Sequence, residues 1–307
     1  GRRCIGDRIE VSVRAEPRPA FLKQLSQRHQ EHPPGQQRRY IFEAPDGVLI
    51  PYSLYLPPAP GELRPMVLYL HALHSRLDGD PSLLRDSDAL PCLLEESTTG
   101  AGGRCPKEVS ESFVVLAPQC PPDPTREDGS GVWFVRGYDD PEYDAAAFER
   151  LRALIAFVVA DCRIDLARIS VVGSSIGGFG CLELAARWPR FFCALAPLSA
   201  YYPWNVGPLV DRLTGPQALP MWFFHSTNDR LCEFAPVREL VARLRGRSRA
   251  EVRLTTFRDT WSGSGHDAEH VAFLASPERR REPALGRELF SWLAGQCAET
   301  AGEGRKK

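Results

Sequence analysis

The sequence predicts an α/β fold in which a mostly parallel sheet carries helices on both faces and an antiparallel hairpin precedes it. Short apolar runs rich in β-branched residues alternate along the chain with segments whose apolar residues recur at helical spacing. The chain has 307 residues, of which 43% are hydrophobic and 25% charged, so it can bury one large core. We therefore expect a single folded domain of the α/β class.

The hairpin is the first predicted element. Residues 40–44 and 48–56 are rich in aromatic and aliphatic side chains, and the Asp46-Gly47 pair between them is typical of a tight turn. Two strands joined by such a turn lie antiparallel, so we expect a hairpin at the start of the domain.

Polar segments lie on either side of the predicted domain, which covers residues 39–297. Residues 1–38 are polar and basic and show no sustained apolar period, so we expect an extension or a short helix there. His29 and His32 belong to this extension and are expected in solvent. Residues 298–307 are expected to form a solvated tail.

Strands and helices alternate after the hairpin. Apolar runs predict buried parallel strands at 66–70, 113–117, 169–172, 194–198, 221–224 and 252–257. Helical spacing of apolar residues predicts helices at 141–161, 177–188, 235–245 and 284–294. Segments 78–111 and 121–140 are rich in Gly, Pro, Ser and Asp, and we expect irregular functional loops there, over the ligand-binding edge of the sheet.

Charge and hydropathy narrow the class of partner. The 38 basic and 39 acidic residues give a formal net charge of -1, so there is no general electrostatic reason to expect nucleic acid. No stretch approaches the roughly 18 apolar residues of a membrane-spanning helix. We expect a small-molecule substrate and a cytoplasmic location, although a chain that begins with Gly1 is compatible with a processed product or a fragment. The sequence does not indicate an oligomeric state.

The nine cysteines indicate reduced thiols. Their odd number, scattered spacing and lack of a CxxC pair argue against a disulfide framework and against a zinc site, so we expect no metal. Cys105 and Cys120 lie on either side of a predicted strand, and a disulfide between them remains an open alternative.

A serine nucleophile is predicted where the strand at 169–172 meets the next helix. Gly173-Ser174-Ser175-Ile176-Gly177 fits the G-x-S-x-G motif in the strand-to-helix context that a nucleophile elbow requires. The motif needs glycines because a Cβ at those positions would collide with the neighbouring strand and helix. Its spacing selects Ser175 over the adjacent Ser174.

A serine nucleophile needs a histidine base and an acid that orients the histidine, in the chain order serine, acid, histidine for this fold. Asp229 follows the apolar strand that ends near His225, so we predict it as the acid, in preference to Asp211 and Asp259.

Two histidines remain downstream of Asp229. His266 is the predicted base because it lies in a glycine-rich loop after the last strand, whereas His270 falls where a helix can begin. An oxyanion hole is also required. We predict the N–H groups of Ile176 and Leu73 as its donors, with Ala72 as the alternative to Leu73, and a structural hydrogen-bonding role for His71.

These residues resemble one branch of the α/β-hydrolases: the esterase, polyhydroxybutyrate-depolymerase-like and predicted-peptidase branch, which is related to feruloyl esterases and phospholipase/carboxylesterases. Besides the serine motif, the matching segments are Leu68-Tyr69-Leu70-His71 with Asp78-Gly79-Asp80, Ala117-Pro118-Gln119-Cys120-Pro121 with Trp133, Ile164-Asp165 to Arg168-Ile169, Trp188-Pro189-Arg190-Phe191-Phe192, His225 to Asp229, and Gly265-His266-Asp267.

The resemblance implies hydrolysis of carboxylic esters through an acyl-enzyme without a cofactor, and it implies that Trp133 lines the acyl or alcohol pocket. Two positions depart from the family pattern, because Ala72 and Ser226 stand where the family has glycine. The Cβ of Ala72 restricts the backbone of the oxyanion loop, so we expect reduced activity or a shifted specificity, and we predict that Ala72 lines the substrate pocket with Trp133.

Two other functions remain open. A serine peptidase uses the same three residues, and a catalytically impaired hydrolase fold can act as a binding protein. Paired ester and peptide substrates separate the two enzymes, and an active-site fluorophosphonate separates both enzymes from the binding protein.

Overall fold

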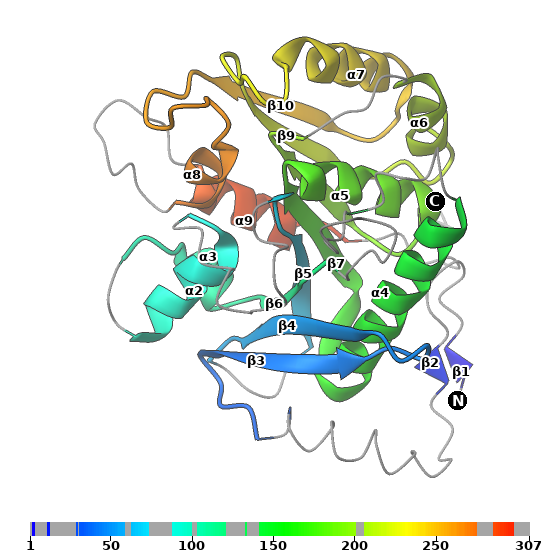
Figure 1. Ribbon diagram of the computed structural model, residues 1–307, viewed down its shortest axis with the longest axis vertical. Helices are drawn as coiled ribbons and strands as arrows, with labels where there is room; N and C mark the ends of the chain where they lie inside the picture. The colour runs from blue at the N-terminus through cyan, green and yellow to red at the C-terminus, as the bar shows by residue number, and fades with distance from the viewer. Residues whose placement is uncertain are drawn as a thin grey trace, which may run out of the picture.

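The computed structural model describes residues 2–3, 11–12, 29, 31–58, 63–73, 88–99, 103–120, 133, 141–200, 206–274 and 285–297. An eight-stranded sheet runs through the molecule in the order β10-β9-β8-β7-β5-β6-β4-β3 (Figure 1). A separate pair of two-residue strands, β1 (Arg2–Arg3) and β2 (Val11–Ser12), lies outside this sheet.

The sheet is mostly parallel. Neighbouring strands from β10 to β6 pair in parallel, whereas β4 is antiparallel to both β6 and β3. The predicted hairpin therefore extends a parallel sheet, which confirms the predicted fold class. The strands are β3 (Gln36–Glu43), β4 (Leu49–Leu56), β5 (Arg64–Leu70), β6 (Val114–Pro118), β7 (Ile164–Ser174), β8 (Ala194–Leu198), β9 (Met221–Ser226) and β10 (Val252–Phe257).

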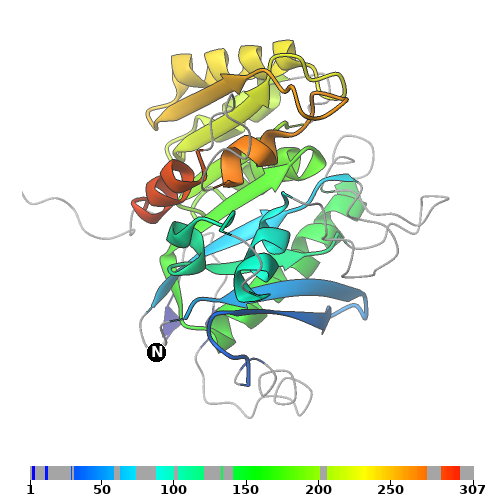
Figure 2. The same ribbon diagram turned by 90° about the vertical axis from the view of Figure 1, so that its left-hand side faces the viewer.

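Helices cover both faces of the sheet (Figures 1 and 2). On one face lie α4 (Pro141–Asp161), α5 (Ile176–Arg187), α6 (Val206–Leu213) and α7 (Phe234–Arg247), whose apolar residues join one hydrophobic cluster. On the other face lie α2 (Leu90–Thr99), α3 (Lys107–Ser110), α8 (Ala268–Phe273) and α9 (Gly286–Ala294), whose apolar residues join a second cluster.

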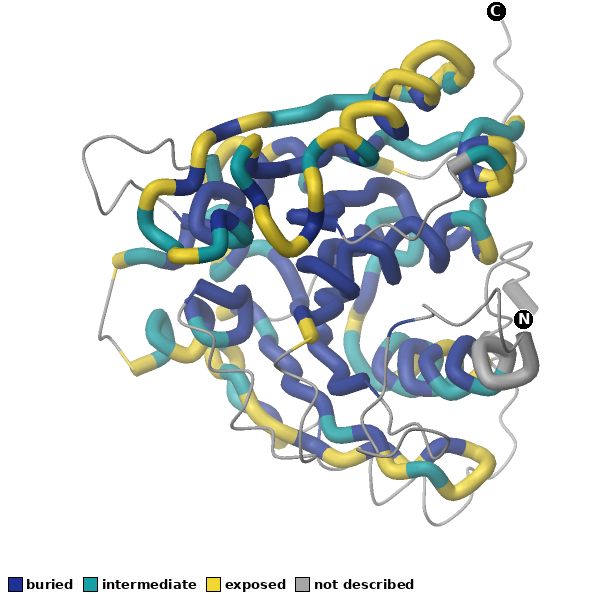
Figure 3. Tube along the Cα trace, turned by 45° about the horizontal axis from the view of Figure 1, so that its top comes forward, coloured by how far each residue is buried: buried dark blue, intermediate teal, exposed yellow. Residues whose placement is uncertain are grey.

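The central strands supply both clusters because successive side chains of a strand point to opposite faces. In β5, Leu68 and Leu70 belong to the first cluster, and Val67 and Tyr69 belong to the second. Buried chain runs through the middle of the molecule in Figure 3, with exposed segments around it. A strand buried on both faces has no polar alternation, which is why the apolar runs identified the sheet.

Segment 78–111 differs from the prediction, because α2 and α3 lie within it. Leu90, Leu93 and Leu94 in the first half of α2 are buried, and the helix packs against β3 and β4. The prediction of an irregular loop throughout this segment was therefore wrong. Of segment 121–140, only Trp133 falls within the described residues.

His29 and His32 also differ from the prediction, because each side chain is buried, with 4% of its surface exposed. His29 Nδ1 lies 2.8 Å from Asp161 Oδ2, and its Nε2 lies 2.8 Å from the Tyr52 hydroxyl. His32 donates from Nε2 to the Gln36 carbonyl at 2.8 Å. The expectation that these histidines are solvated was wrong, because apolar packing against α4 and the hairpin covers them.

Two further expectations concern thiols and membranes. Cys105 and Cys120 are both buried free thiols, so the alternative of a disulfide between them is not realised. Of the helices in the described part of the chain, none combines the length and the apolar character needed to cross a membrane. The expected tail at 298–307 lies outside the described residues.

Candidate active site

Ser175 lies between the end of β7 and the start of α5 and has a strained backbone. Its φ of 56° and ψ of -116° fall outside the regions that residues with a Cβ normally adopt. Such a conformation costs of order 1–3 kcal/mol and persists only where the surrounding structure imposes it. Here the Ser175 N–H donates to the Leu198 carbonyl of β8 at 2.9 Å, which fixes the turn to the sheet.

Close packing explains the glycines on both sides of Ser175. A Cβ on Gly173 would overlap the Gly177 carbonyl of α5, and a Cβ on Gly177 would overlap the Leu70 carbonyl at the end of β5. The sequence rationale for both glycines is therefore confirmed. The turn packs so closely between β5 and α5 that neither Gly173 nor Gly177 has room for a side chain.

The two predicted oxyanion donors belong to neighbouring segments. Ile176 is the first residue of α5, where N–H groups have no carbonyl partner within the helix. Leu73 follows β5, and its side chain is 43% exposed. Because Gly177 packs against the carbonyls of Leu70 and His71, the segment that leads to Leu73 passes directly beside the start of α5.

His71 fixes the segment before Leu73 through hydrogen bonds. Its Nδ1–H donates to the Ala72 carbonyl at 2.7 Å, and its Nε2 accepts from the Cys120 N–H at 2.9 Å. Trp133 Nε1 donates to the His71 carbonyl at 3.0 Å. The predicted structural role of His71 is confirmed, since both ring nitrogens are bonded to the main chain.

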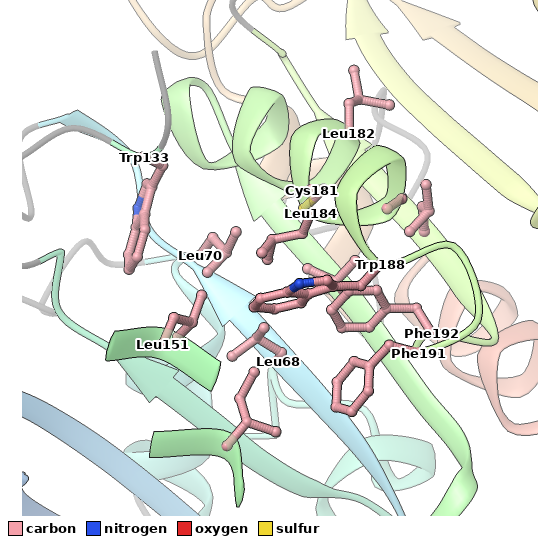
Figure 4. Packing of buried hydrophobic residues seen from close by; sticks show 14 of the residues in the cluster. Leu68, Leu70, Trp133, Leu151, Cys181, Leu182, Leu184, Trp188, Phe191 and Phe192 are labelled. Carbon is pink, nitrogen blue, oxygen red and sulfur yellow. The ribbon is translucent and has the colours of Figure 1, made fainter. Parts of the chain in front are cut away.

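Trp133 lies in the core near Leu70 (Figure 4), and its ring packs against that of His71, with 5.1 Å between the ring centroids. Only 1% of its surface is exposed, and its Cβ lies close to Gly180 of α5. A contact between Trp133 and substrate stays a prediction. Its visible effect is to support the loop beside Ser175.

The predicted acid and base meet directly. Asp229 is buried in the turn after β9, and its Oδ2 accepts from His266 Nδ1 at 2.7 Å. The other carboxylate oxygen, Oδ1, accepts from the N–H groups of Leu231 at 2.9 Å and Cys232 at 2.8 Å. Asp229 is therefore held rigidly, and it fixes the orientation of the His266 ring.

The residues considered as alternatives have other partners. Asp211 forms a surface ion pair with Arg247, with 2.6 Å between Oδ1 and Nη1. His270, in α8, places Nδ1 2.9 Å from Asp88 Oδ2 and stacks on Trp261. Burial opposes the shift, but interactions with His270 and Arg104 lower the pKa of Asp88.

Cys232 was not predicted as part of the site, yet it joins the serine to the acid. Burial, and next the charge of Asp229, raise the pKa of its thiol to about 12, and a side-chain hydrogen bond with Ser175 acts in the opposite direction. The thiol of Cys232, in the turn that holds Asp229, therefore lies near Ser175. The sequence signal for this residue was weak, since a single cysteine after an apolar strand reads as core filler.

His225 is a second histidine beside the acid. Its Nε2–H donates to the Cys232 carbonyl at 2.8 Å, and the same nitrogen lies 3.6 Å from Asp229 Oδ2. Burial lowers the pKa of His225, so the ring is neutral at pH 7. A neutral His225 supports the turn around Asp229 without competing for its charge.

Comparisons with known proteins were made by sequence and by structure. No protein-family model matches the chain, and no curated protein sequence matches it. Similar solved structures include a thermostable esterase, with 24% identity, a TM-score of 0.61 and 85% of this chain covered. The chain spans 63% of the length of that esterase.

Two other similar structures come from bacteria. An S-formylglutathione hydrolase from Agrobacterium tumefaciens has 14% identity and a TM-score of 0.57, with 84% of this chain and 94% of the other covered. The fluorophosphonate-binding serine hydrolase F of Staphylococcus aureus has 14% identity and a TM-score of 0.55, with 85% and 98% covered. At identities this low, the structural likeness shows a shared fold and nothing more. The chain therefore has the α/β-hydrolase fold.

Proposed function

We propose that this protein is a serine hydrolase that cleaves carboxylic esters through an acyl-enzyme, with Ser175, Asp229 and His266 as its catalytic residues. The observation that carries the proposal is the 2.7 Å hydrogen bond between His266 and a buried Asp229, at the carboxyl edge of the sheet where Ser175 has a strained backbone. A serine in a strand-to-helix turn and a histidine oriented by a buried acid are the groups that a serine hydrolase uses to activate its hydroxyl nucleophile.

In the proposed first step, Ser175 Oγ attacks the ester carbonyl while His266 Nε2 accepts the hydroxyl proton. Asp229 holds Nδ1–H and stabilises the imidazolium that forms. The N–H groups of Ile176 and Leu73 donate to the oxygen of the tetrahedral intermediate. His266 then returns the proton to the departing alcohol, which leaves an acyl group on Ser175.

In the second step, His266 Nε2 removes a proton from water, which attacks the acyl carbonyl. The bond from the acyl carbon to Ser175 Oγ then breaks, His266 returns the proton to Oγ, and the carboxylic acid is released. No cofactor enters either half of this scheme. Ester cleavage is favoured over amide cleavage because an alcohol leaves more readily than an amine, and the thermostable esterase with the same fold gives the same indication.

Hydrolysis of p-nitrophenyl acetate and butyrate, with a matched peptide anilide, tests the proposal. We expect turnover of the esters and a loss of more than about 10³-fold in Ser175→Ala, as for nucleophile removal in other serine hydrolases. Ser174→Ala is the control, because it removes the adjacent hydroxyl at the end of β7 and should retain turnover.

Three results would contradict the proposal in different ways. Turnover retained in Ser175→Ala would exclude this nucleophile. Faster cleavage of the anilide than of both esters would make the protein a peptidase. A folded wild type with neither turnover nor fluorophosphonate labelling would point to a binding protein whose Ala72 has closed the oxyanion hole.

A further inference from the structure

Two loops at the carboxyl edge of the sheet carry the proposed acid and base. The acid loop, residues 227–232, follows β9 and contains Asp229. The histidine loop, residues 258–267, follows β10 and contains His266. Because β9 and β10 are parallel neighbours, the two loops leave the sheet side by side. The 2.7 Å hydrogen bond of the proposed pair therefore depends on how firmly each loop is held.

Main-chain atoms of Asp259 join the two loops. Its N–H donates to Ser226 Oγ at 3.1 Å, and its carbonyl accepts from Asn228 Nδ2 at 2.8 Å. A third link is the hydrogen bond from the Arg230 N–H to the Ser264 carbonyl at 3.0 Å. The loops consequently behave as one unit, with Asp259 at its base.

The carboxylate of Asp259 organises the histidine loop from within. It is buried, with 2% of the residue exposed. Its Oδ1 accepts from the N–H groups of Trp261 at 3.0 Å and Ser262 at 2.9 Å. Its Oδ2 accepts from the Ser262 hydroxyl and from the Asp267 N–H, the latter at 3.2 Å.

These bonds fix the chain on both sides of His266. Asp267 immediately follows the histidine and is bonded to Asp259 directly. Gly265 immediately precedes it, and its N–H donates to Ser262 Oγ at 3.0 Å, so it is bonded to Asp259 through one hydroxyl. Gly265 has a φ of 73°, and a Cβ there would overlap the Asn228 carbonyl. The histidine loop therefore packs directly against the acid loop at this residue.

Nothing in the described residues neutralises Asp259 by an ion pair, since its partners are N–H and O–H donors. A buried carboxylate is costly unless hydrogen bonds compensate for lost water. Four donors bonded to one buried side chain hold the loop in one conformation. Any movement that breaks one of these bonds leaves the buried carboxylate without that partner, which is costly.

We propose that Asp259 is the positioning residue of the catalytic histidine: it holds the histidine loop so that His266 stays in register with Asp229. This inference rests on the proposed function. Asp259 is not the catalytic acid, because His266 Nδ1 donates to Asp229. A misplacement of a catalytic group by about 1 Å can cost about 10²-fold in rate, so a remote loop contact can control turnover.

The test compares Asp259→Asn with Asp165→Asn on p-nitrophenyl acetate. The amide nitrogen introduced by Asp259→Asn cannot accept the hydrogen bonds that the replaced carboxylate oxygen accepted. Asp165 is the control, because it also accepts a main-chain N–H two residues along the chain, from Ala167 at 3.0 Å, and pairs with Arg168, but it lies at the amino end of β7. We expect kcat to fall about 10²-fold in Asp259→Asn with KM unchanged, and no such fall in Asp165→Asn.

Two further readouts separate positioning from loss of folded protein. Fluorophosphonate labelling of Asp259→Asn should be slow but should reach one label per chain, whereas partial unfolding would lower the endpoint. In a double-mutant cycle, Asp259→Asn should cost little in an Asp229→Asn background, because both changes act on the same pair. Additive losses would overturn the positioning role.

Ser262→Ala decides the question if Asp259→Asn fails to fold. It removes the hydroxyl between Asp259 and Gly265, and we expect a five- to tenfold lower kcat, about the effect of one hydrogen bond. Wild-type kcat in either folded variant would overturn the inference while leaving the proposed function intact. A wild type without Ser175-dependent turnover would instead overturn the proposed function.

Discussion

Backbone strain is concentrated at one edge of the sheet. Among the described residues, Ser175 and Ser199 are the non-glycine positions with positive φ, at 56° and 39°. Each donates its N–H to the strand beside it, Ser175 to Leu198 and Ser199 to Phe224. Strained residues persist where the surrounding structure over-determines them, and functional sites are where such strain gathers. The strain therefore identifies the same edge as the Asp229–His266 pair does.

Gly177→Ala tests the packing that imposes this strain. The added Cβ would overlap the Leu70 carbonyl, so we expect the free energy of unfolding to fall by about 1–3 kcal/mol, with a loss of ester turnover. Gly246→Ala in α7 is the control, because an added Cβ would meet no atom within 4 Å apart from its chain neighbours and its own helix backbone, and it should be neutral or stabilising by about 0.4–1 kcal/mol. Urea denaturation of both variants measures the difference, and equal stability would contradict the packing account.

The candidate site was predictable only in part at this scale. Ser175 could be selected because glycines at fixed spacing around a serine have a local steric cause. Asp229 and His266 followed from their places after apolar strands. The roles of Cys232 and Asp259 could not be predicted, because they depend on which loops become neighbours when β9 and β10 pair.

Among the helices and strands, the least predictable were those whose apolar residues follow an unusual pattern. In α2 the first half, Leu90 to Leu94, is mostly buried, while the second half from Glu95 is polar. A helix that divides its apolar and polar residues end to end lacks the period that identifies an amphipathic helix. The strands were predictable because burial on both faces leaves an unbroken apolar run.

His32 should make the N-terminal segment sensitive to acid. Burial lowers its pKa from 6.5 to about 4, so the unfolded chain binds a proton first as the pH falls. Stability that is complete above pH 6.5 is then lost towards pH 4, by up to about 3 kcal/mol. Urea unfolding of the wild type and His32→Gln at pH 7 and pH 4.5 should show a smaller pH dependence in the variant. An equal loss in both proteins would contradict this account.

At the scale of the whole molecule, two hydrophobic clusters on opposite faces hold a sheet whose carboxyl edge carries the site. The alternation of strands and helices predicted this class, since a parallel sheet needs helical crossovers. The spatial order of the strands could not be read from the sequence, because pairing such as that of β4 with β6 joins segments far apart in the chain.

Burial in these clusters also limits how fast core cysteine thiols react with a thiol reagent. Cys297 is exposed, whereas Cys181 is buried, and burial raises the pKa of Cys105 to about 12. We expect Cys297→Ser to remove one fast-reacting thiol in titration of the native protein with Ellman's reagent. Cys181→Ser should leave the number of fast thiols unchanged, and a fast thiol lost in that variant would contradict the packing of α5 against the sheet.

Labelling with a fluorophosphonate, followed by mass mapping of the labelled peptide, tests the central claim most directly. The account predicts one label per folded chain, attached to Ser175, and none in a folded Ser175→Ala variant. A label on Ser174 or elsewhere, or a folded wild type that takes no label, would contradict the assignment of Ser175 as an activated nucleophile.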